Sequence, residues 1–295
     1  MSAPRAAAAH GVCDAVSAPR TAVSVLALTL ALALAPTLAL TVPRDSSSQD
    51  FAPAAPAGPQ AGAAALLERA LPLPDDALSL ESSTTRWLGM EALETRAVAL
   101  GLGPGSLRVA AGLSQTGDPE LGWTALALAV GAAGAEGGAG VRVAGRRDRA
   151  AGAVLDGRLA LDSGYEAGAG VWLAAAPGLA LWAVAAQLWT GGEAPPLARP
   201  LELGGRWSAR GLSAWAGLVA PQRGDDGERF AGLAVGAGGL TLWGEARDGP
   251  LRGSVGVRGA VGPLVAEARA DAHPVLAETT RLALAWRRRG KAAGP

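Results

Sequence analysis

From about residue 94 onward, the chain alternates apolar residues with polar or small ones at a period of two. Segment 264–271 places Leu and Ala on one face and Val, Glu, Arg and Asp on the other, and segment 281–287 places Leu and Trp opposite Ala and Arg. An α-helix repeats every 3.6 residues and would gather neither set on one face. The alternation therefore predicts β-strands whose two faces meet different surroundings.

About 14 segments of this kind follow one another, and each can cross a bilayer at a tilt, which takes about 9–11 residues. We expect strands at 94–102, 106–115, 121–132, 139–147, 152–162, 166–175, 179–190, 200–210, 212–220, 228–237, 240–247, 251–260, 264–271 and 279–288. Strands in a bilayer must satisfy every backbone N–H and C=O among themselves, so the sheet must close. The predicted fold class is all-β, a closed antiparallel up-and-down transmembrane β-barrel of about 14 strands, within a range of about 12 to 14.

The lengths of the connections favour an even number of strands. Long connections follow odd-numbered strands in this numbering, at 191–199, 222–227 and 272–278. Short connections follow even-numbered strands, at 116–120, 176–178, 238–239 and 261–263. A barrel with both termini in the periplasm places long loops at one end and tight turns at the other, which is the pattern expected here.

A large soluble β-sandwich or propeller is the alternative fold. Charged residues make up only 18% of the chain, and the rows of Leu, Val and Ala on the outward faces would aggregate in water. These two features favour the membrane barrel. The 26 basic and 26 acidic residues cancel, so the charge gives no electrostatic reason to expect a nucleic-acid partner.

The N-terminal part of the chain has the features of an export signal. Arg5 and Arg20 precede a predominantly apolar run without charged residues at 22–40, and small residues follow at its end. This order predicts a signal peptide at 1–41. The run is about as long as a membrane span of about 20 residues, so an uncleaved helical anchor is the alternative. The single cysteine, Cys13, lies before the run, which leaves no disulfide framework and no Cys-based zinc site.

Residues 42–82 differ from what precedes and follows them. Their first half is rich in Pro, Ala and Gly, which is typical of a flexible periplasmic linker. Leucines at positions 66, 67, 71 and 73 also allow a short amphipathic turn, which would act as a plug entering the domain that follows. We assign 42–82 to this linker or plug segment, 83–290 to the barrel and 291–295 to a tail.

Residues 94–288 resemble a porin-like bacterial outer-membrane β-barrel. The last strand, 281–286, is similar to the alternating, aromatic-ended closing strand that the barrel-assembly machinery recognises, although here residues 287–295 follow it. A barrel of this size with an N-terminal insert is also similar, at the level of the fold, to the long-chain fatty-acid transporter family. The resemblance implies a chain that is exported to the outer membrane, contacts its lipid and binds the assembly machinery.

Tryptophans are placed in a way that supports a lipid interface. Five of them lie at or near the ends of expected strands: Trp123, Trp172, Trp189, Trp207 and Trp286. An aromatic girdle occupies this position in membrane barrels. Three others lie nearer strand middles: Trp182, Trp215 and Trp243.

The inward faces are the best place to look for function. The side chains expected to line the lumen are Arg108, Arg142, Arg146, Asp156, Arg158, Asp162, Glu202, Arg206, Arg210, Glu245, Arg247, Arg252, Arg258, Glu267, Arg269 and Asp271. Arginine-rich pore linings favour anions. We therefore hypothesise a pore or transporter that passes or binds small anionic or amphiphilic solutes with a mild anion preference. The alternatives are an internal salt-bridge network that blocks the bore, and a non-conducting barrel that anchors or scaffolds an envelope complex.

Little in the sequence points to catalysis, and we predict neither an enzyme nor a cofactor. His10 falls in the signal peptide, and His273 stands in a loop two residues after Asp271. A hydrolase at the barrel rim, with His273 as its base, is the enzymatic alternative to an exposed loop histidine. No pair of histidines has the spacing of metal ligands, so we expect no metal site.

Two further motifs have simpler interpretations than ligand binding. The sequence 101–105, Gly-Leu-Gly-Pro-Gly, is similar to a phosphate loop, but it contains Pro and no helix follows, so we interpret it as a hairpin turn. Asp225, Asp226 and Glu228 form an acidic cluster that would bind Ca²⁺ weakly at best. A solvated loop is the simpler interpretation.

Overall fold

The computed structural model describes residues 62–72, 76–103, 105–117, 121–150, 163–192, 201–220, 227–248, 251–272 and 277–289. The expected signal peptide (1–41), the first part of the expected linker and the tail (291–295) lie outside these residues. So does the strand expected at 152–162.

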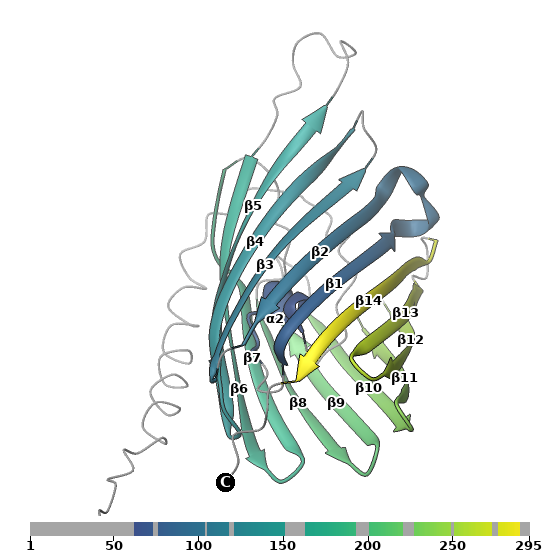
Figure 1. Ribbon diagram of the computed structural model, residues 1–295. Helices are drawn as coiled ribbons and strands as arrows, with labels where there is room; N and C mark the ends of the chain where they lie inside the picture. Colours follow the sequence, from purple (N-terminus) through teal and green to yellow (C-terminus); the bar gives the residue numbers. More distant parts are fainter. Residues whose placement is uncertain are drawn as a thin grey trace, which may run out of the picture.

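The described residues form fourteen strands that close into one barrel, with β1 hydrogen-bonded to β14. The strands are β1 (Asp76–Arg86), β2 (Glu94–Leu102), β3 (Leu107–Gly117), β4 (Leu121–Ala133), β5 (Gly137–Ala150), β6 (Ser163–Ala176), β7 (Leu179–Gly192), β8 (Glu202–Ala209), β9 (Leu212–Val219), β10 (Glu228–Ala237), β11 (Leu240–Arg247), β12 (Arg252–Val261), β13 (Leu264–Ala272) and β14 (Thr279–Arg289). Every strand runs antiparallel to both neighbours, and chain order equals order around the barrel (Figure 1). The predicted fold class is confirmed.

Strand β1 was not predicted from the sequence. It begins at Asp76, before the boundary expected at 83, and it closes the barrel between β2 and β14. Its outward row changes from Leu78 and Leu80 to Ser82 and Thr84, so no continuous apolar alternation marks it. With β1 counted, residues 118–120 follow the odd-numbered strand β3. The connection therefore lies at the same end of the barrel as the longer connections, and the prediction that placed it at the end with the tight turns is wrong.

The other connections that the sequence analysis named follow the expected parity. Tight turns at 177–178, 210–211 and 238–239 follow even-numbered strands. Longer connections, at 193–201 and 220–227, follow odd-numbered strands. The connection from β1 to β2 contains two short 3₁₀ turns, η1 (Trp87–Gly89) and η2 (Glu91–Leu93). In Figure 1 the turns between β6 and β7 and between β8 and β9 lie at the lower end, where β14 also ends.

The outer surface of the barrel is apolar and exposed. Outward positions of successive strands carry leucine and valine, for example Leu126 and Leu128 on β4 and Val141 and Val143 on β5, all of them exposed. On β14, Leu282 exposes 64% of its surface. Such a continuous apolar surface is typical of a barrel wall covered by lipid hydrocarbon.

The tryptophans divide between the two sides of the wall. Trp189, Trp207 and Trp286 are exposed on the outer face, where an aromatic girdle is expected. Trp172 is only 8% exposed and faces the interior, and Trp123 lies under the guanidinium of the inward residue Arg146. The expectation that these last two face the lipid interface is wrong, because position along a strand does not decide which side a residue takes; its parity does.

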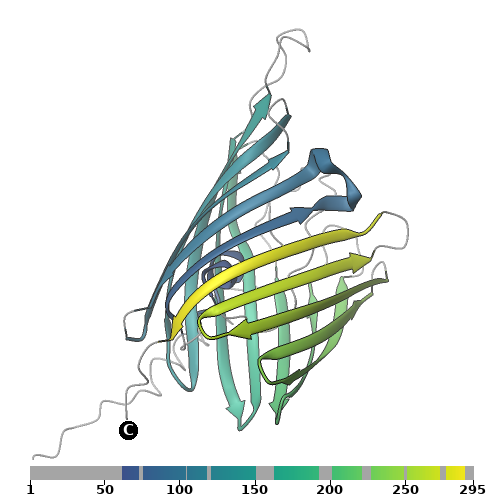
Figure 2. The same ribbon diagram turned by 45° about the vertical axis from the view of Figure 1, so that its right-hand side comes forward.

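A short helical segment lies inside the barrel. Helix α2 (Ala63–Arg69) forms the main part of residues 62–72, which we call the luminal segment, and both views show it surrounded by strands (Figures 1 and 2). Glycines of the wall lie where the backbone of the segment comes closest to the strands. A Cβ atom on Gly170 would come within 2.5 Å of the Arg69 carbonyl oxygen, and one on Gly140 within 2.6 Å of that of Ala70. No helix in the described part of the chain combines the length and hydrophobicity needed to span a membrane.

Candidate functional site in the barrel lumen

Most of the charged residues predicted to line the lumen lie on inward positions of their strands. Asp156, Arg158 and Asp162 lie outside the described residues. Arg210 stands in the turn after β8, exposed and with a positive φ of 45°. The prediction for Arg210 is therefore wrong, since β8 ends at Ala209 and the chain reverses there. The inward residues are Arg108, Arg142, Arg146, Glu202, Arg206, Glu245, Arg247, Arg252, Arg258, Glu267, Arg269 and Asp271.

Six further charged residues on the described strands face inward, although they were not predicted to line the lumen. They are Glu81, Asp148, Glu166, Glu228, Arg281 and Arg287. Glu81 belongs to the strand that was missed, and Asp148 lies beyond the expected end of its strand. Glu228 had been interpreted as part of an acidic loop, but it begins β10. Arg281 and Arg287 share a face of the alternating pattern, so that pattern contained the signal needed to place them.

The inward carboxylates are matched with inward arginines. The Arg247 Nε lies 2.7 Å from the Glu245 carboxylate, and the Arg269 Nε lies 2.7 Å from that of Asp271. Other pairs of the wall are Arg142–Glu166, Arg146–Asp148, Arg252–Glu228, Arg258–Glu267 and Arg287–Glu81. Ion pairs therefore line much of the inner wall, and four of these pairs, Arg142–Glu166, Arg252–Glu228, Arg258–Glu267 and Arg287–Glu81, join different strands.

A second repeated unit combines tryptophan, glycine and glutamate. Trp182 on β7 lies over its cross-strand partner Gly204, and its indole Nε1 donates to Glu202 over 2.8 Å. Trp215 on β9 lies over Gly232 in the same way and donates to Glu245 over 2.7 Å. Glycine leaves room for the indole against the backbone, and the carboxylate fixes the orientation of the ring.

The luminal segment is held to the wall at both ends. At its beginning, the Ala63 N–H donates to the Glu81 carboxylate over 2.6 Å. At its end, the Trp172 indole donates to the Pro72 carbonyl oxygen over 2.5 Å. Because an α-helix is electropositive at its N-terminus, the carboxylate of Glu81 also suits the charge distribution of α2.

Side chains fix the middle of the segment. Arg69 forms an ion pair with Glu202 on β8, and both side chains are largely buried. Leu71 packs into an inner apolar cluster that includes Trp172, Trp182 and Phe230. On another side, Leu66 and Leu67 pack against alanines of β2, β3 and β4. The segment thus connects walls of the barrel that lie far apart in the sequence.

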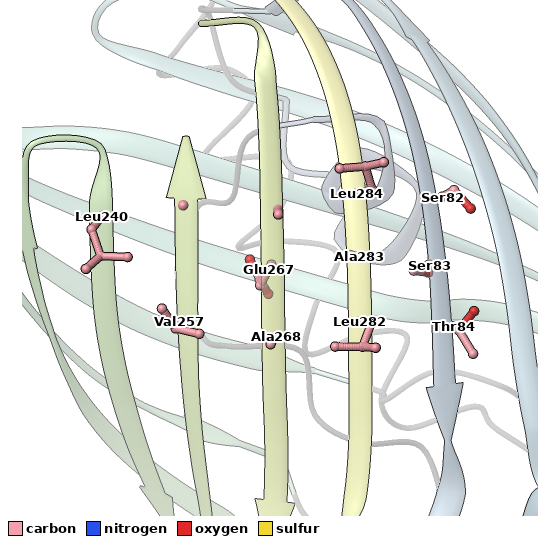
Figure 3. A pocket seen from close by; sticks show the side chains of 12 residues that line it. Ser82, Ser83, Thr84, Leu240, Val257, Glu267, Ala268, Leu282, Ala283 and Leu284 are labelled. Carbon is pink, nitrogen blue, oxygen red and sulfur yellow. The ribbon is translucent and has the colours of Figure 1, made fainter. Parts of the chain in front are cut away.

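A separate hollow lies on the outside of the barrel. Leu240, Leu282, Leu284 and Ala268 line it (Figure 3), as does Ala266. These residues occupy outward positions of β11, β13 and β14, and the leucines are exposed. The hollow therefore faces the lipid side and is separate from the lumen.

The other motifs of the sequence contribute little to the described site. His273, Asp225 and Asp226 lie outside the described residues. The Gly-rich sequence at 101–105 ends β2 and enters the turn to β3, as expected of a hairpin. Within the described ranges, no three His, Cys, Asp or Glu side chains group as metal ligands.

Comparisons with known proteins give likenesses of fold. The sequence matches no protein-family model, and it matches none of the curated proteins. Among solved structures, the outer membrane protein Omp33 of Acinetobacter baumannii is similar with a TM-score of 0.45 and 8% identity, over 73% of this chain and 99% of that one. A triple mutant of the Rhodopseudomonas blastica porin has a TM-score of 0.39 and 8% identity, over 72% and 99%. CdiB from Acinetobacter baumannii has a TM-score of 0.43 and 8% identity, over 72% and 60%. At this identity the likeness concerns the fold alone.

Proposed function

We propose that this protein is an outer-membrane pore that passes small solutes and has a mild preference for anions. The observation that carries the proposal is the closed barrel whose inner wall is charged and whose outer wall is apolar. A barrel with this distribution of side chains suits a lipid exterior and a hydrated interior. The proposal needs no cofactor and no catalytic residue.

Part of the inner surface is open to solvent. The side chain of Arg258 on β12 is 31% exposed, and that of Arg281 on β14 is 23% exposed, although both face inward. The backbone of the luminal segment lies nearest to β1 to β7, and the carboxylate of its Glu68 lies 3.3 Å from Arg281. These features support a hydrated path beside the segment.

The preference for anions follows from the charges that line this path. Inward arginines of the described strands outnumber the inward carboxylates, and the luminal segment adds Glu68 and Arg69, whose charges cancel. Most of the arginines are paired, so the net positive field is small. A mild selectivity is therefore proposed, not a strong one.

A non-conducting barrel that anchors or scaffolds an envelope complex is the second candidate. The observation that favours it is the luminal segment, which is tied to opposite walls through Glu81, Glu202 and Trp172. In this case the ion pairs and the segment would stabilise the wall and close the bore.

Export and assembly complete the proposal. We propose that residues 1–41 direct export and that β14 is recognised by the barrel-assembly machinery, after which the apolar outer wall contacts outer-membrane lipid. The alternating leucines and Trp286 of β14 support this role. Fractionation of a strain that expresses the full chain would place the protein in the outer membrane, and a soluble periplasmic form would contradict it.

Planar-bilayer recording tests the pore directly. The purified full chain is inserted into a neutral bilayer under a KCl gradient, and the reversal potential gives the ratio of chloride to potassium permeability. We expect discrete conductance steps with chloride moderately favoured. Cation selectivity would contradict the anion preference, and a folded barrel without conductance would favour the anchor.

A further inference from the structure

One inward carboxylate differs from all others in the source of its positive partner. Within the described strands, Glu81, Asp148, Glu166, Glu228, Glu245, Glu267 and Asp271 each pair with an arginine of the wall. Glu202 instead pairs with Arg69, which belongs to the luminal segment. The wall therefore leaves this one carboxylate to be neutralised from the lumen.

The neighbouring Trp215–Glu245 unit shows what a complete site of this kind contains. There the indole donates to Glu245, and Arg247 of the same strand supplies the cation at 2.7 Å. The Trp182–Glu202 unit has the same indole donor. Its cation comes from Arg69. A buried carboxylate without a cation is strongly unfavourable, so the geometry of the wall calls for a positive group at this point.

Residues of the wall supply the carboxylate and the aromatic side chains of the Glu202 site. Trp182 lies over Gly204 and stacks on Phe230, with ring centroids 6.4 Å apart. Both aromatic side chains are less than 5% exposed. The carboxylate is held by the indole, and the aromatic cluster forms an apolar wall beside it.

The occupant seen in the structure defines the chemistry that the site accepts. The guanidinium of Arg69 meets the carboxylate, and its Cζ lies 5.8 Å from the centroid of the Trp182 ring. Two residues further on, Leu71 fills the apolar cluster. A cation that is held by a carboxylate and an aromatic face, with an aliphatic group beside it, is bound by charge, by cation–π attraction and by apolar burial together.

We infer that the Glu202 site is a binding site for a solute that carries a guanidinium group beside a short aliphatic chain. Arg69 and Leu71 occupy it as the chain's own equivalent of that solute. The inference rests on the proposed function in one respect, since the solute reaches the site through the lumen. Binding displaces Arg69 and frees the middle of the luminal segment from the wall.

The test measures binding of butylguanidinium to the full chain in detergent, by isothermal titration calorimetry and tryptophan fluorescence. Arg69→Ala removes the chain's own guanidinium. Glu202→Gln in the same background removes the carboxylate. Each variant is first shown to be folded by its heat-modifiable migration on a gel. Butylurea serves as the uncharged control ligand.

We expect Arg69→Ala to bind butylguanidinium saturably and roughly tenfold more tightly than the unaltered chain, in which tethered Arg69 competes at high effective concentration. Butylurea should not bind, and Glu202→Gln should abolish binding. The inference is overturned if folded Arg69→Ala does not bind the probe, if butylurea binds equally, or if Glu202→Gln in the Arg69→Ala background binds the probe equally well. Because calorimetry does not require conductance, a non-conducting barrel that binds the probe would refute only the pore.

Discussion

Gly170 offers a direct way to ask whether the luminal segment can leave the wall. A Cβ atom on this residue would lie 2.5 Å from the Arg69 carbonyl oxygen, 2.9 Å from that of Ala70 and 3.0 Å from a methyl carbon of Leu71. All three atoms belong to the luminal segment. Gly170→Ala therefore places a methyl group where the segment now lies, and one of the two must move.

The size of the effect follows from the cost of overpacking. Adding a carbon atom to a closely packed site costs about 1–3 kcal/mol. If the strain is relieved when the segment leaves the wall, the fraction of displaced molecules rises roughly 5- to 150-fold. Gly145→Ala is the matched control, because a Cβ atom there meets nothing within 4 Å.

Thiol labelling measures the displaced fraction. Ala65 is 4% exposed, so a cysteine placed there reacts slowly with a maleimide while the segment is docked. The chain contains only Cys13, and Cys13→Ser removes that background. We expect Gly170→Ala to increase the labelling rate at position 65 by the factor above, and Gly145→Ala to leave it unchanged. Equal rates in two folded variants would refute the reasoning, since the wall would then have yielded instead of the segment.

Three further predictions concern the barrel as a whole. An unboiled sample should migrate faster on an SDS gel than a boiled one, because a closed barrel resists unfolding by cold detergent; identical migration would contradict a closed barrel. Leu128→Arg, at an exposed outward position, should destabilise the barrel by about 2–4 kcal/mol in urea titrations in lipid vesicles, whereas Thr241→Arg on the inner face should have a much smaller effect. Arg258→Glu should shift the reversal potential in a KCl gradient toward cation selectivity, while Arg96→Glu, an outward residue whose side chain is 80% exposed, should not; an equal shift in both would mean that the inner charges do not select ions.

Alternation alone was enough to predict most of the barrel. The pattern at 264–271 gave β13 and the side that each of its residues faces, because successive residues of a strand point to opposite sides whatever surrounds it. It failed for β1, where Ser82 and Thr84 interrupt the outward apolar row. It failed again for Arg210, since a turn residue and the last residue of a strand look alike in composition.

The candidate site was predictable only as a list of charged side chains. Glu202 and Arg247 were expected to face the lumen, and they do. The sequence could not show which carboxylate pairs with which arginine, because pairing depends on strand register and on the curvature of the closed wall. It also left two interpretations open for residues 62–72, a spacer or a plug.

A wall with an apolar outside and a charged inside was predictable from the residue pattern, because the strand period of two is a local property of the backbone. The place of the luminal segment inside that wall became clear only from the folded chain, as did the contact of Arg69 with Glu202, a residue 133 positions away. Closure of the sheet brings such distant residues together, and their contact depends on how many strands close the barrel and in what register.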